Sequence, residues 1–294
     1  MKISVIMPCY KMGRFIGEAL ASVGAQTYEN WELLAVDDNG SEDGTRAAVE
    51  RFAEQHPRHR IEYIRHETNR GVSAARNTAI RAAQGELLAF LDPDDWWGNR
   101  YLSLQAARLD GEPNFGMTYT DAWRVNEQGR ALADKQGPSE EMADNVLSCL
   151  FLGNFIVPSA VVVRKSEILR IGGFDENPGI QHVEDWDMWL RLARAGVGMA
   201  YTPEGKCYYR QHASSATGDP IKVYDRLLAL RLKHMDDKEF VEANFRRLRE
   251  LEISIQHHRQ DTRSVFDIFK LLIRRLLPAK VVAAIRRCRQ CLGH

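Results

Sequence analysis

Short apolar runs alternate with helix-like segments along the first hundred residues, and this alternation restricts the fold more than any other feature of the chain. Short apolar runs are typical of strands buried on both faces of a sheet. The segments between them repeat apolar residues at helical spacing, so each has one apolar face. This alternation predicts a parallel sheet with right-handed crossovers and helices on its faces. The predicted strands are residues 3–7, 31–36, 61–64 and 86–91.

A polar segment follows each of these strands directly. Ligands of open α/β sheets bind in the crevice beyond the carboxyl ends of the strands. We therefore expect the four segments to face one crevice and to form the functional site. They are PCY (8–10), DDNGSED (37–43), HETNRGVSAARN (66–77) and DPDD (92–95).

The chain after residue 100 is less regular. Residues 115–125 and 159–165 are predicted strands, and residues 127–141, rich in Gly, Pro and Glu, are expected to form an exposed loop. Residues 183–196 are predicted to form a helix. From about residue 222 the pattern is helical throughout.

Asp92, Asp94 and Asp95 allow two interpretations. Asp favours turns, and Pro93 forces the preceding residue to be extended, so the segment could be a turn with no further role. Unpaired like charges at a crevice are costly without a cation, however, and a cluster of carboxylate oxygens selects Mg²⁺ or Mn²⁺. A calcium EF-hand is excluded, because Trp97 occupies the position of its central glycine.

Asp37 and Asp38 follow the second strand, where a dinucleotide-binding fold places an acid that binds ribose. The glycine fingerprint of that fold is absent, because the first strand continues into PCYKMGRFIG. One of the two aspartates is expected to cap the turn. A purely structural role for both is not expected.

Charge, hydropathy and cysteine content exclude several classes of protein. Lys plus Arg and Asp plus Glu both total 40, so nothing indicates nucleic-acid binding. No apolar stretch approaches the length of a membrane-spanning helix, and the N-terminus does not resemble a signal peptide. The 5 scattered cysteines favour a reducing cytoplasm, and the lone CxxC at 288–291 makes zinc improbable. We therefore expect a cytoplasmic protein.

Residues 263–291 form a basic amphipathic segment that is interrupted near Pro278. Such a pattern suits an anionic membrane surface, and a protein bound there would lie peripherally on the inner face of the cytoplasmic membrane. A helical cap on the catalytic domain and a dimer contact explain the pattern equally well.

Four stretches together resemble glycosyltransferase family 2, the inverting enzymes of the GT-A fold. The resemblance covers roughly residues 1–217 in family order. It implies a Rossmann-like, mostly parallel α/β sheet flanked by helices, with a C-terminal helical extension. The stretches are SVIMPCYKMGRFIGEALASVGAQTYENWELLAVDDNGSEDGT, NRGVSAARNTAIRAAQGELLAFLDPDDWW, GGFDENPGIQHVEDWDMWLRLARAG and YYRQHASSAT.

The activity implied by this resemblance is transfer of a sugar from a nucleotide-diphosphate donor to a hydroxyl group. UDP is the expected nucleotide, Mn²⁺ or Mg²⁺ the expected cofactor, and a saccharide or lipid-linked molecule the expected acceptor. Residues 1–100 would then be the nucleotide-sugar-binding half, residues 101–220 the acceptor-binding half, and residues 221–294 the helical extension.

The nucleotide-binding residues can be carried over position by position. Pro8 and Tyr10 would flank the base. Asp38 would bond the imide edge of the base, while Asp37 supports the loop. Arg76 would lie near the base and phosphates, although a helix residue of this kind could equally be a solvated surface charge.

The DPDD segment would bind the rest of the donor. Asp92 would take the ribose hydroxyls, and Asp94 would coordinate the metal that bridges the diphosphate. Asp95 would support Asp94 and is also a candidate sugar contact. His212 matches a position that contacts the metal or diphosphate in many relatives, although a lone histidine is more often structural.

Asp185 matches the position of the family's general base, which takes the proton of the acceptor hydroxyl. Glu184 would orient the acceptor or the donor sugar. An acid in the first turn of a helix is also favoured by capping and by the helix dipole, and this is the alternative to a catalytic role. Asp187 is expected to lie on the helix surface.

Trp96 and Trp97 are candidate sugar contacts, because tryptophan faces stack on sugar rings, although large aromatic residues are more often core. Two other functions share parts of this pattern. A nucleotidyltransferase should carry a glycine-rich basic loop after the first strand, where this chain has only Lys11 and Arg14. A nucleotide-binding scaffold without activity would be expected to lack an acid from one motif, and none is missing.

Overall fold

The computed structural model describes residues 1–40, 42–138, 145–212 and 220–234. These belong to one compact unit, Met1–Val241. A second unit, Glu242–His294, lies outside the described residues, and so do the basic segment 263–291 and most of the predicted helical extension. In the described part of the chain, no helix is long and apolar enough to cross a bilayer.

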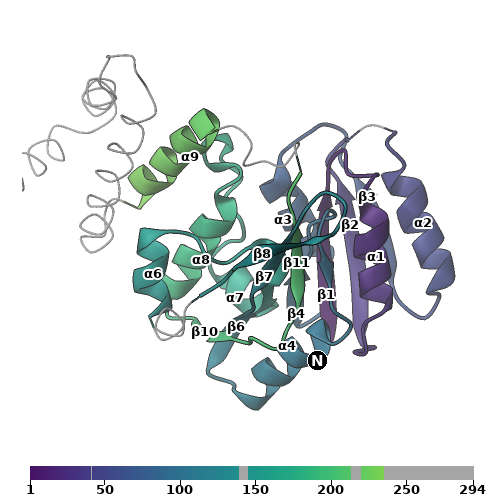
Figure 1. The fold of residues 1–294 in the computed structure, drawn as a ribbon, viewed down its shortest axis with the longest axis horizontal. Helices are drawn as coiled ribbons and strands as arrows, with labels where there is room; N and C mark the ends of the chain where they lie inside the picture. Colours follow the sequence, from purple (N-terminus) through teal and green to yellow (C-terminus); the bar gives the residue numbers. More distant parts are fainter. Residues whose placement is uncertain (41, 139–144, 213–219, 235–294) are drawn as a thin grey trace, which may run out of the picture. The chain divides into compact units, whose positions relative to one another are not determined.

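A seven-stranded sheet forms the centre of the unit, in the order β10-β6-β9-β4-β1-β2-β3 (Figure 1). β9 is antiparallel to its neighbours β4 and β6, and the other pairs are parallel. The predicted mostly parallel α/β sheet is therefore confirmed. The strands are β1 (Ile3–Cys9), β2 (Trp31–Asp37), β3 (Ile61–Arg65), β4 (Leu87–Phe90), β6 (Phe115–Tyr119), β9 (Val161–Arg164) and β10 (Gly198–Tyr201).

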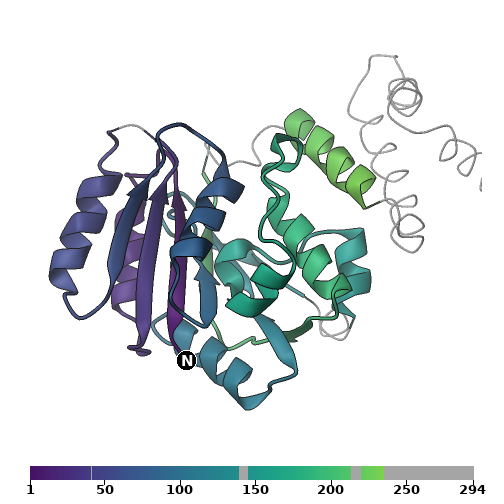
Figure 2. The same ribbon diagram turned by 180° about the vertical axis from the view of Figure 1, so that it is seen from behind.

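Helices cover both faces of this sheet. Figures 1 and 2 show α1 and α2 on one face and α3 on the other. Every residue of β1, β2 and β4 is buried, which explains why these strands are continuous apolar runs without alternation. The helices are α1 (Ile16–Gly24), α2 (Thr45–Gln55), α3 (Val72–Ala82), α4 (Tyr101–Gly111), α6 (Val146–Leu152), α7 (Lys165–Arg170), α8 (Glu184–Arg194) and α9 (Pro220–Lys233), with short 3-10 turns η1 (Pro158–Ala160) and η2 (Pro178–Ile180).

A second sheet of four strands brings residues that follow β4 beside residues near the end of the described chain. Its order is β5-β11-β7-β8. β5 runs antiparallel to β11, with Trp97 opposite Cys207, so the DPDD segment lies next to the strand that leads to His212. The strands are β5 (Trp96–Trp97), β7 (Ala122–Val125), β8 (Ala131–Gln136) and β11 (Cys207–Arg210).

Two predictions for this region were wrong. Residues 115–125 form two strands, β6 and β7, which belong to different sheets. Residues 131–136, expected within a loop, form the edge strand β8, which pairs with β7. β8 is exposed and carries charged side chains, so its sequence lacks the apolar pattern by which strands are recognised.

Candidate active site

Asp37 and Asp38 end β2 and hold the loops around it. Tyr63 Oη donates to Asp37 Oδ2 at 2.6 Å, and the amide of Gly40 donates to Asp37 Oδ1 at 2.7 Å. Both aspartates are buried, with 3% exposure each. Asp37 therefore closes the turn that follows β2.

The carboxylate of Asp38 holds the start of α3. It accepts hydrogen bonds from the amides of Arg70 and Gly71, at 2.9 Å and 2.6 Å, and its Oδ1 lies 2.7 Å from His66 Nδ1. A carboxylate offers about four acceptor positions. Most of them are used within the chain, and the contact of Asp38 with a base stays a prediction.

The end of β1 presents an aromatic ring to solvent. Pro8 is buried within the strand, whereas Tyr10 is 43% exposed and has the Lys11 ammonium group 5.1 Å from its ring centroid. Tyr10 follows directly on the strand that pairs with β2, and the amide of Asp38 donates to the carbonyl of Cys9 at 2.8 Å. An open ring beside two buried carboxylates suits a flat heterocycle, as expected for a nucleotide base.

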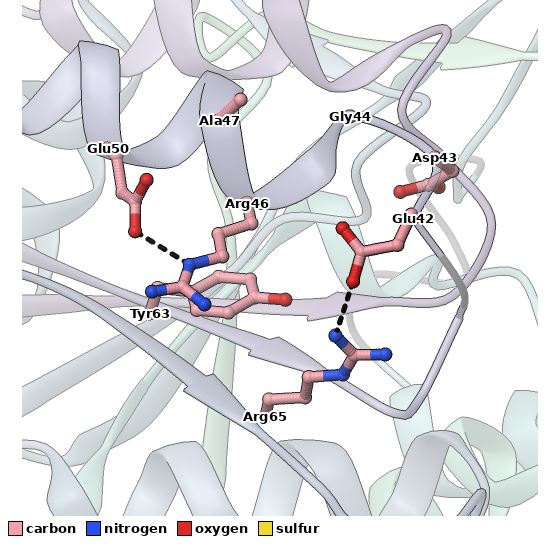
Figure 3. A pocket seen from close by; sticks show the side chains of 8 residues that line it. All are labelled: Glu42, Asp43, Gly44, Arg46, Ala47, Glu50, Tyr63 and Arg65. Carbon is pink, nitrogen blue, oxygen red and sulfur yellow. Dashed lines mark hydrogen bonds and ion pairs between the residues drawn. The ribbon is translucent and has the colours of Figure 1, made fainter.

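A small pocket of about 140 Å³ lies between α2 and β3 and is lined by residues of both and of the turn before α2 (Figure 3). Its charged walls are paired with each other: Arg46 lies 2.7 Å from Glu50, and Arg65 lies 3.1 Å from Glu42. Arg46 also lies across the ring of Tyr63, the residue that bonds Asp37. This pocket supports the end of β2 through Tyr63, and both of its arginines are paired within the lining.

The DPDD segment separates its three aspartates into two environments. Asp92 and Asp94 are partly exposed, at 26% and 17% of their side chains. Asp95 is 1% exposed, and it accepts hydrogen bonds from Ser159 Oγ at 2.5 Å and the Arg210 amide at 2.9 Å. Burial, together with the charges of Asp94 and Asp92, raises the pKa of Asp95 well above its usual value. Asp95 fastens the segment to η1 and β11.

Trp96 and Trp97, which follow this segment, differ in their exposure to solvent. Trp97 is 3% exposed, stacks on Tyr101, and donates from Nε1 to the Ser159 carbonyl at 2.6 Å. Trp96 is partly exposed and stacks on Tyr208, with a ring distance of 5.1 Å. Asp95 and Trp97 are buried and hydrogen-bonded within the framework of the site, and a sugar contact by either residue stays a prediction. Trp96 remains a candidate.

His212 lies beside Asp94, and both are predicted metal ligands. Its Nε2 is 2.9 Å from Asp94 Oδ2, and its ring packs 4.8 Å from that of Phe15. A carboxylate with an imidazole suits Mn²⁺, whereas Mg²⁺ prefers oxygen ligands alone. Among the described residues, no three His, Cys, Asp or Glu side chains are arranged so that they could hold a metal ion together. The pair therefore fits a divalent cation that takes its remaining ligands from phosphate oxygens and water.

Arg76 lies inside the protein and connects the two halves of the site. Its side chain is 2% exposed, so the alternative of a solvated surface charge was wrong. Nη2 lies 2.9 Å from Asp92 Oδ1, and Nη1 lies 2.6 Å from Glu184 Oε1. The guanidinium group also lies over the ring of Phe174. A single cation thus joins the DPDD segment to helix α8.

Helix α8 presents Asp185 next to this ion pair. Asn154 Nδ2 donates to Asp185 Oδ2 at 2.8 Å, and the amide of Trp186 donates to Oδ1 at 2.8 Å. Burial and the neighbouring charge of Glu184 raise the pKa of Asp185 to about 7, against the opposing effect of Arg76. A carboxylate with a pKa near neutrality is suited to proton transfer at physiological pH.

Asp187 is not the helix surface residue that the sequence suggested. It is fully buried, and its carboxylate lies 2.7 Å from Arg191 Nε, 2.7 Å from Lys233 Nζ and 2.8 Å from His234 Nε2. Although burial acts in the opposite direction, these partners hold the pKa of Asp187 well below its usual range. The expectation failed because Lys233 and His234 belong to α9 and its end, far along the chain.

Four residues of the site were not identified from the sequence. Ser159 on η1 bonds Asp92 and Asp95, and Asn154 bonds Asp185. Arg210 binds the backbone of Asp94 through Nε at 2.9 Å. Tyr209 on β11 is the fourth, and burial and the nearby charges of Asp95, Asp94, Asp92 and Asp185 raise its pKa. Only Arg210 and Tyr209 had a signal in the sequence, since they end a short strand two and three residues before His212.

The comparison with known families decides the identity of this arrangement. The family model described as glycosyl transferase family 2 matches residues 4–150. The chain belongs to glycosyl transferase family 2. A relative of this family 2 chain is the UDP-Glc:alpha-D-GlcNAc-diphosphoundecaprenol beta-1,3-glucosyltransferase WfgD of Escherichia coli, which is 32% identical over 76% of this chain and 83% of its own length. Four further relatives are longer, and the family 2 chain spans 20% to 30% of their length.

Solved structures with less than 25% sequence identity share the fold. TarS of S. aureus in complex with UDP has a TM-score of 0.63 at 19% identity, covering 95% of this chain and 76% of that one. The mannosyltransferase PcManGT from Pyrobaculum calidifontis, in complex with GDP-Man and Mn²⁺, has a TM-score of 0.63 at 22% identity, covering 83% and 68%. The expected GT-A fold is confirmed.

Proposed function

We propose that this protein is an inverting glycosyltransferase that uses Asp185 as its general base. The observation that carries the proposal is the position of Asp185 on α8, where its pKa is raised to about 7 and Arg76 links its neighbour Glu184 to Asp92. The base and the donor-binding acids thus belong to different elements joined by one cation. A single displacement needs the base and the donor-binding acids on opposite sides of the donor sugar, because the acceptor must attack from the face opposite the leaving nucleotide.

The proposed reaction is a single displacement at the anomeric carbon of the donor sugar. Asp185 takes the proton of an acceptor hydroxyl, whose oxygen forms a bond to the anomeric carbon of the donor sugar. The bond between that carbon and the diphosphate oxygen breaks, and the electron pair leaves with the nucleoside diphosphate. The configuration at the anomeric carbon inverts, and no covalent sugar–enzyme intermediate forms.

The leaving diphosphate gains negative charge, and the site must offset it. Asp94 and His212 would hold a divalent metal ion beside the diphosphate. When bound, such an ion supplies Lewis-acid stabilisation of the leaving group. Asp92, with 26% of its side chain exposed, would bind the ribose hydroxyls, and Tyr10 would stack on the base.

The proposed donor is a UDP-sugar and the proposed acceptor is a saccharide or a lipid-linked sugar. The name of WfgD specifies a UDP-glucose donor and a GlcNAc-diphosphoundecaprenol acceptor, and TarS has been solved with UDP-GlcNAc. A lipid-linked acceptor would place the protein peripherally at the inner face of the cytoplasmic membrane. The basic segment 263–291, outside the described residues, is proposed to make that contact.

The test is a transfer assay with UDP-glucose or UDP-GlcNAc, Mn²⁺ and a GlcNAc-diphospholipid acceptor. We expect a β-linked product from the α-linked donor, as NMR of the anomeric proton would show. An α-linked product would contradict the inverting mechanism. Nucleotide binding without transfer to any saccharide or lipid-linked acceptor would favour the scaffold alternative.

A further inference from the structure

The Arg76 side chain is buried although it carries a permanent charge, and its place in a helix does not explain this. Arg76 occupies the middle of α3, and its side chain is 2% exposed. A guanidinium group cannot lose its charge in a protein, so it is stable in the interior only beside counter-charges. Asp92 from the DPDD segment and Glu184 from α8 supply them at 2.9 Å and 2.6 Å.

Arg76 uses one oxygen of each carboxylate. It bonds Asp92 Oδ1 and Glu184 Oε1. Glu184 Oε2 is buried and has no hydrogen-bond partner in the described part of the chain. A buried carboxylate oxygen without a partner costs free energy, which a ligand hydroxyl would remove. Arg76 therefore fixes Glu184 through Oε1, while Oε2 stays buried without a partner among the described residues.

The same cation faces Asp185. Four groups surround that carboxyl from separate elements: Glu184 on α8, Arg76 from α3, Asn154 from the segment after α6, and Tyr209 from β11. His182, in the turn before α8, faces Glu184 and Arg76, and its pKa is lowered by burial and by the charge of Arg226. Among the four groups around Asp185, Arg76 carries the positive charge and Glu184 the negative charge.

We propose that Arg76 is a positioning residue that holds Asp92 of the DPDD segment and Glu184 of α8 in one arrangement, next to Asp185. The catalytic meaning of this role rests on the proposed function of Asp185. The positioning of Asp92 and Glu184 does not depend on that function, because Arg76 bonds both carboxylates without any ligand. Arg76 touches no reacting atom and acts through the two carboxylates that it holds.

The test follows the titration of Asp185 itself, in protein labelled with ¹³C at aspartate carboxyl groups. The signal of Asp185 is assigned by its loss in Asp185→Asn. In Arg76→Gln the midpoint of this titration is expected to rise by at least one pH unit, because the negative charge of Glu184 is then unopposed. In the double variant Arg76→Gln with Glu184→Gln it returns towards the wild-type midpoint. Arg81→Gln, an exposed arginine of the same helix, serves as the matched control and leaves the midpoint unchanged.

A wild-type midpoint in folded Arg76→Gln would overturn the proposal. If that variant does not fold, Arg76→Lys gives the decision, because it keeps the charge and loses the planar fork that bonds both carboxylates. Its midpoint is expected to lie above that of the wild type and its UDP affinity below, and wild-type values of both would overturn the proposal. A second readout is UDP affinity, which is expected to fall in Arg76→Gln as Asp92 loses its partner and to stay constant in Arg81→Gln.

These measurements need neither a sugar donor nor an acceptor. If Asp185 is not the general base, transfer by Asp185→Asn persists while the titration shifts still occur. If Arg76 has no positioning role, the shifts are absent while Asp185→Asn still loses transfer. The two failures are therefore distinguishable.

Discussion

Two acid-rich segments, residues 92–95 and residues 184–187, look alike in the sequence and behave differently in the structure. In the first, Asp95 is buried and accepts hydrogen bonds from a hydroxyl and a backbone amide. Burial and the neighbouring aspartates raise its pKa. In the second, Asp187 is buried beside Arg191, Lys233 and His234, and these partners lower its pKa. Each segment thus uses one acid to hold itself in place, and we propose that the others bind the donor or act in the reaction.

The acids within each segment differ in their surroundings because of the local backbone geometry. Successive residues on a helix project about 100° apart, so Asp185 and Asp187 face different surroundings. Asp187 meets the end of α9, whereas Asp185 meets Asn154 and the Arg76 ion pair. In the loop, Asp92 and Asp94 stay partly exposed at the strand end. A run of acids therefore indicates a site, but the partners of each acid decide its role.

The largest effect is expected for Asp185→Asn. Loss of the base should reduce transfer by about 10³-fold, within the usual range for general-base catalysis. UDP affinity should remain that of the wild type, because Asp185 lies on α8 and not in the DPDD segment. Initial rates of transfer and a calorimetric titration of UDP measure the two quantities. Full transfer activity in this variant would disprove the assignment of the base.

Asp187→Asn is expected to act on stability. It leaves Arg191, Lys233 and His234 without their shared counter-charge, which costs about 3 kcal/mol. This value is at the low end of the range for buried pairs, because Lys233 is 31% exposed. The melting temperature should fall by about 6–12 °C for a domain of this size.

Asp175→Asn is the matched control for this variant, because Asp175 lies 2.7 Å from the same lysine but is 31% exposed. An exposed pair of this kind contributes at most about 1 kcal/mol. Equal melting temperatures for the two variants would contradict the role given to Asp187.

Transfer is expected to depend on pH through Asp185. The reaction needs the ionised carboxylate, and its pKa is about 7, so the rate should rise with pH up to that value and level off above it. Two pH units below the pKa, the ionised fraction and the rate would be about 100-fold lower. A profile of initial rates at saturating donor measures this. A flat profile between pH 5 and 8 would argue against a base with a raised pKa.

Asp94→Asn and Asp95→Asn test the contrast within the first segment. Loss of a charged contact costs about 1.5–3 kcal/mol, so Asp94→Asn should weaken Mn²⁺-dependent UDP binding by roughly 10- to 100-fold. Asp95→Asn should change UDP affinity only slightly, because an amide can occupy the same buried position between Ser159 and Arg210. Titration of UDP with Mn²⁺ distinguishes them, and the reverse order would contradict the assignment.

The sequence predicted those features that depend on neighbouring residues. Strands β1 to β4 and the polar segments after them are local patterns, and topology alone brings their ends together. The partners of the acids are different, because Ser159, Asn154 and Lys233 come from distant parts of the chain and carry no local signal. The burial of Asp95 and Trp97, and the position of Asp187, could not be predicted for this reason.

The most direct test of the account is a calorimetric titration of UDP into the wild-type protein, with and without Mn²⁺. We expect UDP binding that depends on Mn²⁺, with the same affinity in Asp185→Asn as in the wild type. If neither UDP nor GDP, dTDP or CDP bound under either condition, the strand-end acids would not form a nucleotide site, and the proposed function would be contradicted.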